Sequence, residues 1–442
     1  MQYQDRKEMH KINHANIKDW AKNYDGELFD GILCDPPYHL VSGRTSEEIG
    51  HPSWNSKTKS SRSAKKKGFM GKDWDGVDEN GIGIAQDPEM WRLLYNLLKP
   101  GAHLLAFSGS RTYHRMAVAI EDAGFEIRDT IIYAYGSGFP KALDIHKQVQ
   151  KIDPENNEWL GYKTALKPAF EPCVLARKPL DGTVAQNVLK HGTGGLNIDG
   201  TRIGTDGGGT HCNNRDINGK CLGHKDNNDR YGETIHTDNI QGGRFPANLI
   251  HDGSDEVEAV FPQTGGGKAK EAGVGNGSSI FAGAGRTGFT IGDSGSASRY
   301  FYCAKASKSE RNAGLEGFEP QITNDGREKD IDNAFQRGTT LRSNHHPTVK
   351  PLSLTKYLAT LIKPPTGGRL LVPFSGSGSE MIGALQAGWE YVEGVELTEE
   401  YIPIAEARIK YWQNISQTSS KPKVSAKNAE PVQNTAESLT LF

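Results

Sequence analysis

The sequence predicts an α/β protein with a doubly wound sheet whose core strands are parallel. Three features lead to this fold class: helical and strand-like segments alternate over residues 88–135, a short apolar segment at 29–34 stops at two prolines, and an apolar segment at 369–373 enters a turn rich in glycine and serine. Strands that alternate with helices form parallel sheets, and ligands bind such sheets at the carboxyl ends of their strands. We therefore expect the functional residues directly after residues 34 and 373.

The first expected strand, Phe29–Cys34, ends at Asp35-Pro36-Pro37-Tyr38. The prolines fix φ and have no N–H, so they cannot continue a strand and they hold the neighbouring carbonyls rigidly. The tetrapeptide thus brings together an acid, a rigid carbonyl and an aromatic ring. An ordinary turn is the alternative interpretation, because Asp-Pro-Pro also suits turns.

These four residues suit a reaction at the exocyclic amine of a nucleobase, whose lone pair is delocalised into the ring. The Asp35 carboxylate and the Pro36 carbonyl can each accept one N–H, which frees the lone pair, and the carboxylate stabilises the positive charge that develops. Tyr38 offers a face on which the base can stack. A base in a duplex must first be flipped out to reach such a site.

Residues 39–80, directly after the tetrapeptide, carry the densest positive charge of the chain. We expect a flexible arm that closes over a phosphate backbone beside the active site. A solvated, partly disordered loop is the alternative. The basic residues of this segment are Arg44, Lys57, Lys59, Arg62, Lys65, Lys66, Lys67 and Lys72.

Alternating regular elements follow the basic segment. Apolar residues at helical spacing predict a helix over Pro88–Leu98, which Lys99-Pro100-Gly101 ends. A strand at Ala102–Ser108, a helix at His114–Ala123 and a strand at Phe125–Tyr135 are expected next. This alternation is typical of parallel sheets with helices on both faces.

A second ligand-binding stretch begins with the expected strand at 369–373 and the turn Phe374-Ser375-Gly376-Ser377-Gly378. A helix with apolar residues at helical spacing follows, and a strand at 391–396 ends in Glu396. Glycines permit a tight turn and a close approach of the backbone to a ligand, and an acid about twenty residues further on suits the hydroxyls of a ribose. The combination predicts a site for a nucleoside cofactor.

Together the two stretches resemble the amino-methylating DNA methyltransferases that depend on S-adenosylmethionine. Asp35-Pro36-Pro37-Tyr38 is similar to the catalytic tetrapeptide of that family, and the turn at Phe374 is similar to its F-x-G-x-G cofactor turn. His346-Pro347-Thr348-Val349-Lys350-Pro351 resembles the segment that contacts the methionine end of the cofactor. The catalytic motif precedes the cofactor motif, with a long variable region between them, which is the order of the family's beta class.

The resemblance implies a Rossmann-like methyltransferase domain in two halves, with a loop-rich target-recognition insertion between them. Residues 1–150 would be the catalytic half, 151–340 the Gly-rich insertion, 341–412 the cofactor-binding half and 413–442 a disordered tail. The insertion is expected to contact guanine or phosphate through arginines. The candidates are Arg202, Arg215, Arg230, Arg244 and Arg286.

The resemblance also implies the roles of the site residues. S-adenosylmethionine would sit at the turn that begins with Phe374, with Glu396 on its ribose and with Thr348 and Lys350 near its carboxylate end. The amine of a flipped adenine, held by the Asp35 tetrapeptide, would attack the sulfonium methyl group in line. Adenine N6 is preferred because an acid opens the tetrapeptide, whereas serine is commoner there among enzymes that methylate cytosine N4.

Other activities stay open at this stage. Cytosine N4 is an alternative target because the same mechanism serves both bases. Methylation of another planar amide, such as a protein glutamine, and an inactive DNA-binding protein are further alternatives. Double-stranded DNA is the expected partner, and proteins of the beta class are often homodimers.

The chain departs from the family pattern at a few positions. Val372 stands where an acid is common, and Ser379-Glu380 follows the glycines where a threonine is common. Glu380 at the start of a helix suits the helix dipole and can take over contact with the ammonium of the cofactor. Asn16 stands near the place of an acid that touches the adenine ring.

Composition limits the remaining possibilities. The net charge is −2, so a phosphate-binding surface must be local. The five cysteines are scattered, no apolar run approaches the length of about twenty residues that spans a bilayer, and the N-terminus is polar, so we expect a cytoplasmic protein without disulfides. Zinc is not expected, because the four candidate ligands lack the usual spacing. These candidates are His211, Cys212, Cys221 and His224.

Overall fold

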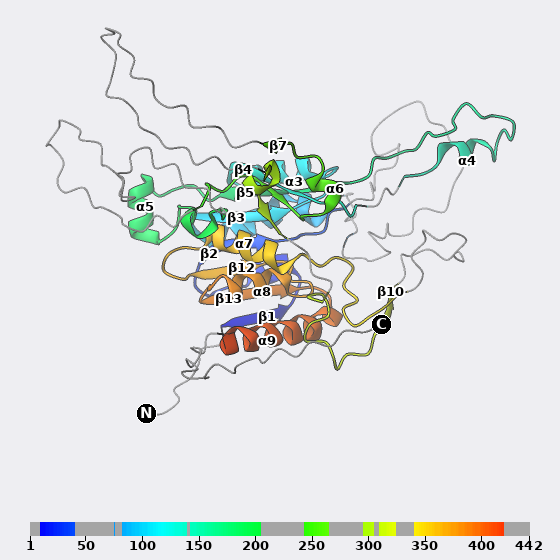
Figure 1. The fold of residues 1–442 in the computed structure, drawn as a ribbon. Coiled ribbons are helices and arrows are strands. Elements are labelled where there is room, and N and C mark those ends of the chain that lie inside the picture. The colour runs from blue at the N-terminus through cyan, green and yellow to red at the C-terminus, as the bar shows by residue number, and fades with distance from the viewer. Residues whose placement is uncertain are drawn as a thin grey trace, which may run out of the picture.

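The computed structural model describes residues 9–39, 75, 82–138, 142–204, 243–264, 295–304, 309–323 and 340–419. Its centre is a nine-stranded sheet (Figure 1). In spatial order the strands are β1 (His10–His14), β13 (Tyr391–Glu396), β12 (Arg369–Val372), β2 (Phe29–Cys34), β3 (Leu98–Phe107), β5 (Phe170–Arg177), β4 (Glu126–Ala134), β6 (Leu249–His251) and β9 (Tyr302–Cys303).

Most neighbouring strands are parallel, which confirms the expected fold class. The first five strands in this order, from β1 to β3, are parallel to their neighbours, and so are the last three, β4, β6 and β9. β5 lies between β3 and β4 and is antiparallel to both. Ladders on both sides of this strand hold residues 170–177 in extended form. An antiparallel strand starts where its parallel neighbours end, so the first residues of β5 reach the carboxyl edge of the sheet.

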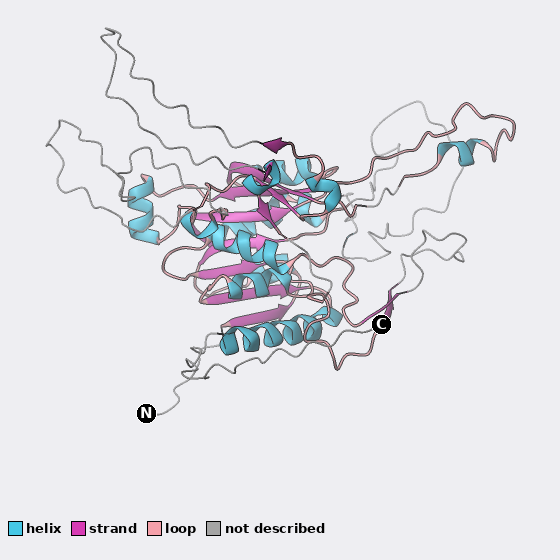
Figure 2. Ribbon diagram, in the orientation of Figure 1, coloured by secondary structure: helices cyan, strands magenta, loops and turns pink. Residues whose placement is uncertain are grey.

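Helices cover both faces of the sheet (Figure 2). One face packs against α1 (Ile17–Lys22), α2 (Pro88–Asn96) and α3 (Tyr113–Asp122), and the other packs against α7 (Leu352–Ile362), α8 (Ser379–Gln386) and α9 (Ile402–Ser419). Gly383 lets α7 and α8 approach closely, since a Cβ there would lie 2.3 Å from Thr355 Oγ1. Two apolar cores, one on each face, thus hold the sheet in the middle of three layers.

The catalytic half follows the expected order with small shifts at the ends. The side chain of Asp87 accepts from the Glu89 N–H and caps α2, which ends at Asn96. Lys99-Pro100-Gly101 belongs to β3 and does not end the helix as expected. The extended start of β3 is held partly by an ion pair of 2.7 Å between Lys99 Nζ and Asp30 Oδ1.

The remaining elements lie outside the three layers. They are α4 (Ile145–Val149), α5 (Val184–His191), α6 (Asp255–Glu258), the antiparallel pair β7 (Gln263–Thr264) and β8 (Gly295–Ser296), and the antiparallel pair β10 (Gln321–Thr323) and β11 (Thr340–Arg342). The segment around α4 projects away from the sheet (Figure 1). The last helix, α9, continues past residue 412, where we expected the folded part to end.

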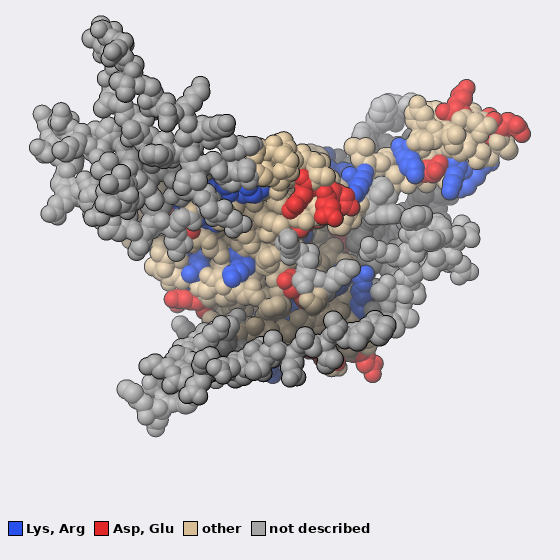
Figure 3. All heavy atoms as spheres, in the orientation of Figure 1, with Lys and Arg blue, Asp and Glu red and all other residues tan. Residues whose placement is uncertain are grey.

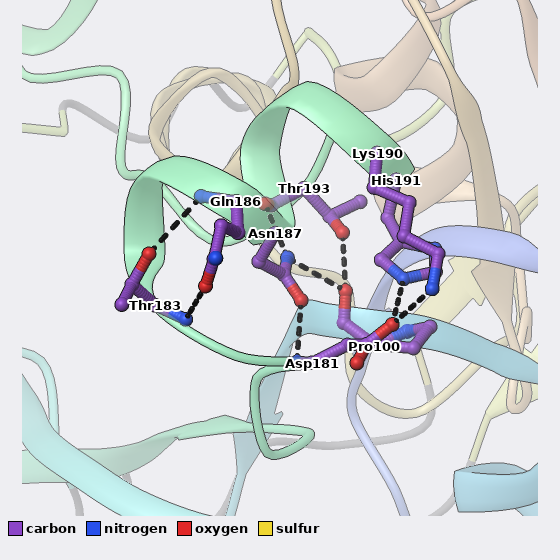
Figure 4. Close-up of polar contacts among 8 residues, drawn as sticks. All are labelled: Pro100, Asp181, Thr183, Gln186, Asn187, Lys190, His191 and Thr193. Carbon is purple, nitrogen blue, oxygen red and sulfur yellow. Dashed lines mark hydrogen bonds and ion pairs between the residues drawn. The ribbon is translucent and has the colours of Figure 1, made fainter.

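Buried polar contacts fasten α5 to the start of β3 (Figure 4). A capping box between Thr183 and Gln186 begins the helix. The fully buried Asn187 donates to the carbonyls of Pro100 and Thr193, at 3.1 and 2.8 Å, and accepts from the Asp181 N–H. The chain directly after β5 is therefore anchored to the sheet rather than free of it.

Several expectations fall outside the described residues. These are the basic segment 39–80 apart from His39 and Asp75, the cluster of two histidines and two cysteines at 211–224, the arginines at 215, 230 and 286, and the tail from 420 onward. Among the described side chains, no group of three or more His, Cys, Asp or Glu residues is arranged to hold a metal ion. None of the helices in the described ranges is long and apolar enough to cross a membrane.

Candidate active site

The candidate site lies at the carboxyl edge of the sheet, between β12 and β2. The chain leaves β12 through α8 toward β13 and leaves β2 through α2 toward β3, so the two connections run to opposite sides. Such a switch point opens a crevice at the ends of the strands. The structure has a cavity of about 980 Å³ there, lined by residues that follow both strands.

The cavity brings together nearly all the site residues that the sequence predicts. Residues of the tetrapeptide, the glycine turn and the segment before α7 line it, namely Asp35, Pro36, Pro37, Tyr38, Thr348, Lys350, Phe374, Ser375, Gly376, Ser377 and Glu396. Gly378 is not in the lining. It has a φ of +83° at the start of α8, where a Cβ would lie 3.2 Å from the Ala405 Cβ, so glycine is needed there for the close approach of α9.

Asp35 stands at the end of β2 with its two oxygens in different surroundings. Its Oδ2 lies 2.6 Å from Lys350 Nζ. Its Oδ1 is buried and accepts no hydrogen bond. Asp35 lines the cavity, and Oδ1 is its oxygen without a protein partner.

Lys350 is at the centre of a group of polar side chains. Besides Asp35, its ammonium contacts Glu171 Oε2 at 3.1 Å and donates to Tyr38 Oη at 2.9 Å. Tyr38 in turn donates to Glu171 Oε2 at 3.2 Å. Burial alone would lower the pKa of Lys350, but the carboxylates of Asp35 and Glu171 raise it above its usual value, so the lysine is a cation at neutral pH. We call Asp35, Tyr38, Glu171 and Lys350 the carboxylate cluster.

Sequence reasoning missed Glu171. It is in β5, whose antiparallel direction places the first residues of the strand beside the ends of β3 and β4. Residues 164–171, which lead into this strand from the projecting segment around α4, all line the cavity. An acid at the start of an otherwise apolar strand was the available signal, but nothing local indicated that the strand runs antiparallel.

The glycine turn, Phe374–Gly378, is tied to the end of β13. The Gly376 N–H donates to Glu396 Oε2 at 2.8 Å, and the Thr398 N–H donates to Glu396 Oε1 at 2.7 Å. Burial raises the pKa of Glu396, although these backbone donors oppose the shift. The Ser375 Oγ is buried without a hydrogen-bond partner. The turn and Glu396 therefore form one unit that presents polar atoms to the cavity.

Gly376 needs to be glycine for two reasons. Its φ is +48°, which side chains rarely adopt, and a Cβ there would lie 2.8 Å from His346 Nε2. The backbone can thus come close to a ligand that lies over the turn.

The fully buried Arg408 of α9 supports the turn from below. Its guanidinium donates to the carbonyl and the Oγ of Ser377, at 2.5 and 3.0 Å, and to the Oγ of Ser379 at 3.2 Å. Burial lowers the pKa of Arg408 to about 10, so it is still charged at neutral pH. Sequence reasoning missed this residue, because it lies a full helix away from the turn that it holds.

A further buried acid, Glu380, lines the cavity from the first turn of α8. Burial and the charge of Asp35 raise its pKa, and Lys350 lowers it. The inner part of the cavity thus gathers three acids around one lysine. This surplus of acids favours a ligand that carries positive charge.

Two of the five candidate arginines of the expected recognition insertion are described, and both are held within the fold. Arg202 Nε donates to Asp199 at 2.8 Å, and Arg244 donates to the carbonyl of Arg299 at 3.0 Å and lies over the Tyr300 ring. In the face shown in Figure 3, the acids of α6 gather in one patch, and the segment around α4 carries both signs of charge. A broad basic surface is absent from the described part of this face, in line with the near-neutral net charge.

The fold and the site together define a class: a Rossmann-like α/β domain with a glycine turn and an acidic tetrapeptide in one crevice. The chain is 27% identical over 190 residues to the type II methyltransferase M.HindIII of Haemophilus influenzae, a match that covers 40% of the chain and 61% of that relative's length. This homology to a methyltransferase confirms the resemblance inferred from the motifs. No protein-family model matches the chain.

Two solved structures align with most of this chain at lower sequence identity. M1.HpyAVI is 12% identical with a TM-score of 0.37, and the alignment covers 91% of this chain and 98% of that one. The cytosine-N4-specific PvuII DNA methyltransferase is 11% identical with a TM-score of 0.39, covering 92% and 91% of the two chains.

Proposed function

We propose that the chain is a site-specific DNA methyltransferase that transfers a methyl group from S-adenosylmethionine to the exocyclic amine of a base. One observation carries the proposal: Asp35, whose Oδ1 accepts no hydrogen bond from the protein, lines the same cavity as the glycine turn and Glu396. The sequence relationship to a type II methyltransferase supports it.

The residues present fit the cofactor. Gly376 leaves room for close approach, Ser375 Oγ has no protein partner, and Glu396 keeps lone pairs beyond the two backbone N–H groups that it accepts. The glycine turn and Glu396 would hold the nucleoside part, and Glu380 suits the ammonium group. When bound, S-adenosylmethionine supplies a methyl group activated on a positively charged sulfur.

The chain's own residues prepare the amine. Asp35 Oδ1 accepts one N–H of the base and the Pro36 carbonyl accepts the other, which draws the nitrogen toward tetrahedral geometry. The ionised carboxylate then stabilises the positive charge that grows on this nitrogen. Tyr38 provides the stacking face and is held in place by Lys350 and Glu171.

The finer proposal is that the base is adenine, methylated at N6 after it is flipped out of double-stranded DNA. Its support is the acid at the first position of the tetrapeptide, Asp35. Cytosine N4 is the second candidate, since the same two acceptors serve either amine. A homodimer stays a prediction, which sedimentation of the purified protein would test.

The test uses the purified chain, S-adenosylmethionine and DNA from cells that lack methylation. Digestion to nucleosides and mass spectrometry, with Asp35→Ala in parallel, should show N6-methyladenine that disappears in the variant. N4-methylcytosine would overturn the choice of base and leave the reaction in place. Normal cofactor binding without any methylated base would contradict DNA as the substrate, and failure to bind the cofactor would favour an inactive DNA-binding protein.

A further inference from the structure

Three oxygen atoms of the protein surround the ammonium of Lys350. A lysine ammonium has three N–H groups. In the structure it has three oxygen partners, Asp35 Oδ2 at 2.6 Å, Tyr38 Oη at 2.9 Å and Glu171 Oε2 at 3.1 Å. The ammonium also lies 4.7 Å from the centroid of the Phe107 ring. The carboxylate of a cofactor at this ammonium would compete with these three oxygens and be repelled by the carboxylates of Asp35 and Glu171.

The same lysine balances acids that come from distant parts of the chain. Asp35 follows β2, Glu171 begins β5 and Glu380 opens α8. Lys350, which is 8% exposed, is the cation within ion-pair distance of the first two. Like charges in a buried site oppose ionisation, so without this cation at least one of the acids would take up a proton.

We propose that Lys350 and Glu171 are positioning residues for Asp35 rather than ligands of the cofactor. Lys350 fixes Oδ2 and places a positive charge beside the carboxylate, so that Oδ1 is held as an acceptor without a protein partner. Glu171 fixes Lys350 and the Tyr38 hydroxyl. Its negative charge lies near that of Asp35, so the positive charge of Lys350 is needed to offset their repulsion. This inference rests on the proposed function, because Asp35 is the residue that prepares the amine.

A pH test must consider every titratable group near Asp35. These groups are Lys350 and His346 from the segment before α7, Glu171 and Cys173 from β5, Glu380 from α8, Tyr38 from the tetrapeptide, Cys34 from β2, and Tyr133 and Tyr135 from β4. Burial raises the pKa of the thiols and the phenols. They therefore stay neutral from pH 6 to pH 9, and the carboxyl groups determine the response.

The experiment compares Lys350→Met, Glu171→Gln and the double variant Lys350→Met/Glu171→Gln. Methyl transfer in a single turnover, at saturating S-adenosylmethionine and DNA, is measured from pH 6 to pH 9. We expect Lys350→Met to lose about 100-fold at pH 7 and to regain rate as the pH rises, because a protonated Asp35 no longer accepts the amine. The double variant should recover at least about tenfold over Lys350→Met, since removal of one acid lowers the need for the cation.

Two controls separate this role from a general loss of structure. Lys356→Met removes an exposed lysine of α7 and should leave rate and pH profile unchanged. Lys350→Arg keeps the charge and should keep a flat pH profile even if the rate falls. The proposal would be overturned in favour of a cofactor contact by three results together. Lys350→Met would raise the dissociation constant for S-adenosylmethionine, its rate at saturation would be unchanged, and Glu171→Gln would not rescue it.

A second readout needs no activity: the thermal midpoint of unfolding, measured without cofactor as a function of pH. We expect removal of Lys350 to raise the pKa of a carboxyl group in the folded state. This carboxyl group then stabilises the fold below about pH 4, where it is protonated, and the stabilisation is lost as the pH rises through the raised pKa. The deficit of Lys350→Met should thus grow toward pH 8 and shrink in the double variant. A deficit that does not change with pH would contradict the inference. An inactive wild-type protein would contradict the proposed function, and this readout would still decide the inference.

Discussion

The glycine turn and the carboxylate cluster line one cavity, but the chain builds them in different ways. The turn, its helix and the acid that braces it all belong to residues 369–396, a single strand-turn-helix-strand unit. The carboxylate cluster takes Asp35, Glu171 and Lys350 from three segments that are more than a hundred residues apart. The first region is a local structure, and the second exists only after the sheet has formed.

The difference indicates a division of labour. Residues of the glycine turn should determine how tightly the cofactor binds. Residues of the carboxylate cluster should determine how fast the methyl group is transferred once both ligands are bound. A substitution in either region that lowers cofactor affinity and the rate of methyl transfer equally would contradict this division.

The largest effect is expected at Tyr38. Tyr38→Ala removes the stacking face, worth about 1–3 kcal/mol per base, and should lower the rate of methyl transfer about 100-fold with little change in cofactor affinity. Tyr38→Phe keeps the ring but loses the hydrogen bonds of the hydroxyl with Glu171 and Lys350, so its rate should fall less than about tenfold. Single-turnover rates and calorimetric titration with the cofactor measure the two quantities, and an equal loss in both variants would assign the effect to the hydroxyl instead.

Arg408 tests whether the turn depends on a remote support. Arg408→Met leaves the Ser377 carbonyl without its buried donor and should lower the free energy of unfolding by about 2 kcal/mol. Denaturation with urea measures the change. Arg92→Met, which removes an exposed arginine of α2 that donates to the Asp122 carbonyl, should cost less than about 0.5 kcal/mol. Equal losses would mean that the turn does not need this arginine.

Glu396 tests the cofactor side directly. Glu396→Gln removes the charge and places an amide N–H₂ group against one of the two backbone donors, at Gly376 or Thr398. Cofactor affinity should fall about tenfold, or about 1.4 kcal/mol, while the rate at saturation stays the same. Glu390→Gln changes an exposed acid just before β13 and serves as the control. A lower rate at saturating cofactor would place Glu396 in the chemical step and break the division.

The smallest effect is expected at Gly376. Gly376→Ala forces a side chain into a left-handed conformation and toward the His346 ring, so cofactor binding should weaken about fivefold, or about 1 kcal/mol. Gly161→Ala has the same kind of backbone, with a φ of +87°, but nothing within 4 Å of the added Cβ, and it should not change binding. Unchanged binding in both variants would show that the ligand does not need the close approach.

The sequence by itself determined the parts of this protein that depend on neighbours along the chain. Strand β2 with its proline stop, the turn after β12 and the acid at the end of β13 were all predicted, since apolar runs, glycines and prolines act within a few residues. The expected α/β class followed from the alternation of such segments.

Only the tertiary structure decided which distant residues meet. The antiparallel direction of β5 brings Glu171 to the carboxyl edge, the packing of α9 brings Arg408 under the turn, and the start of α7 brings Lys350 to Asp35. These contacts join residues up to 315 positions apart. Strand direction and helix packing depend on how the apolar surface of the whole sheet is buried. The pattern of a few neighbouring residues therefore does not predict them.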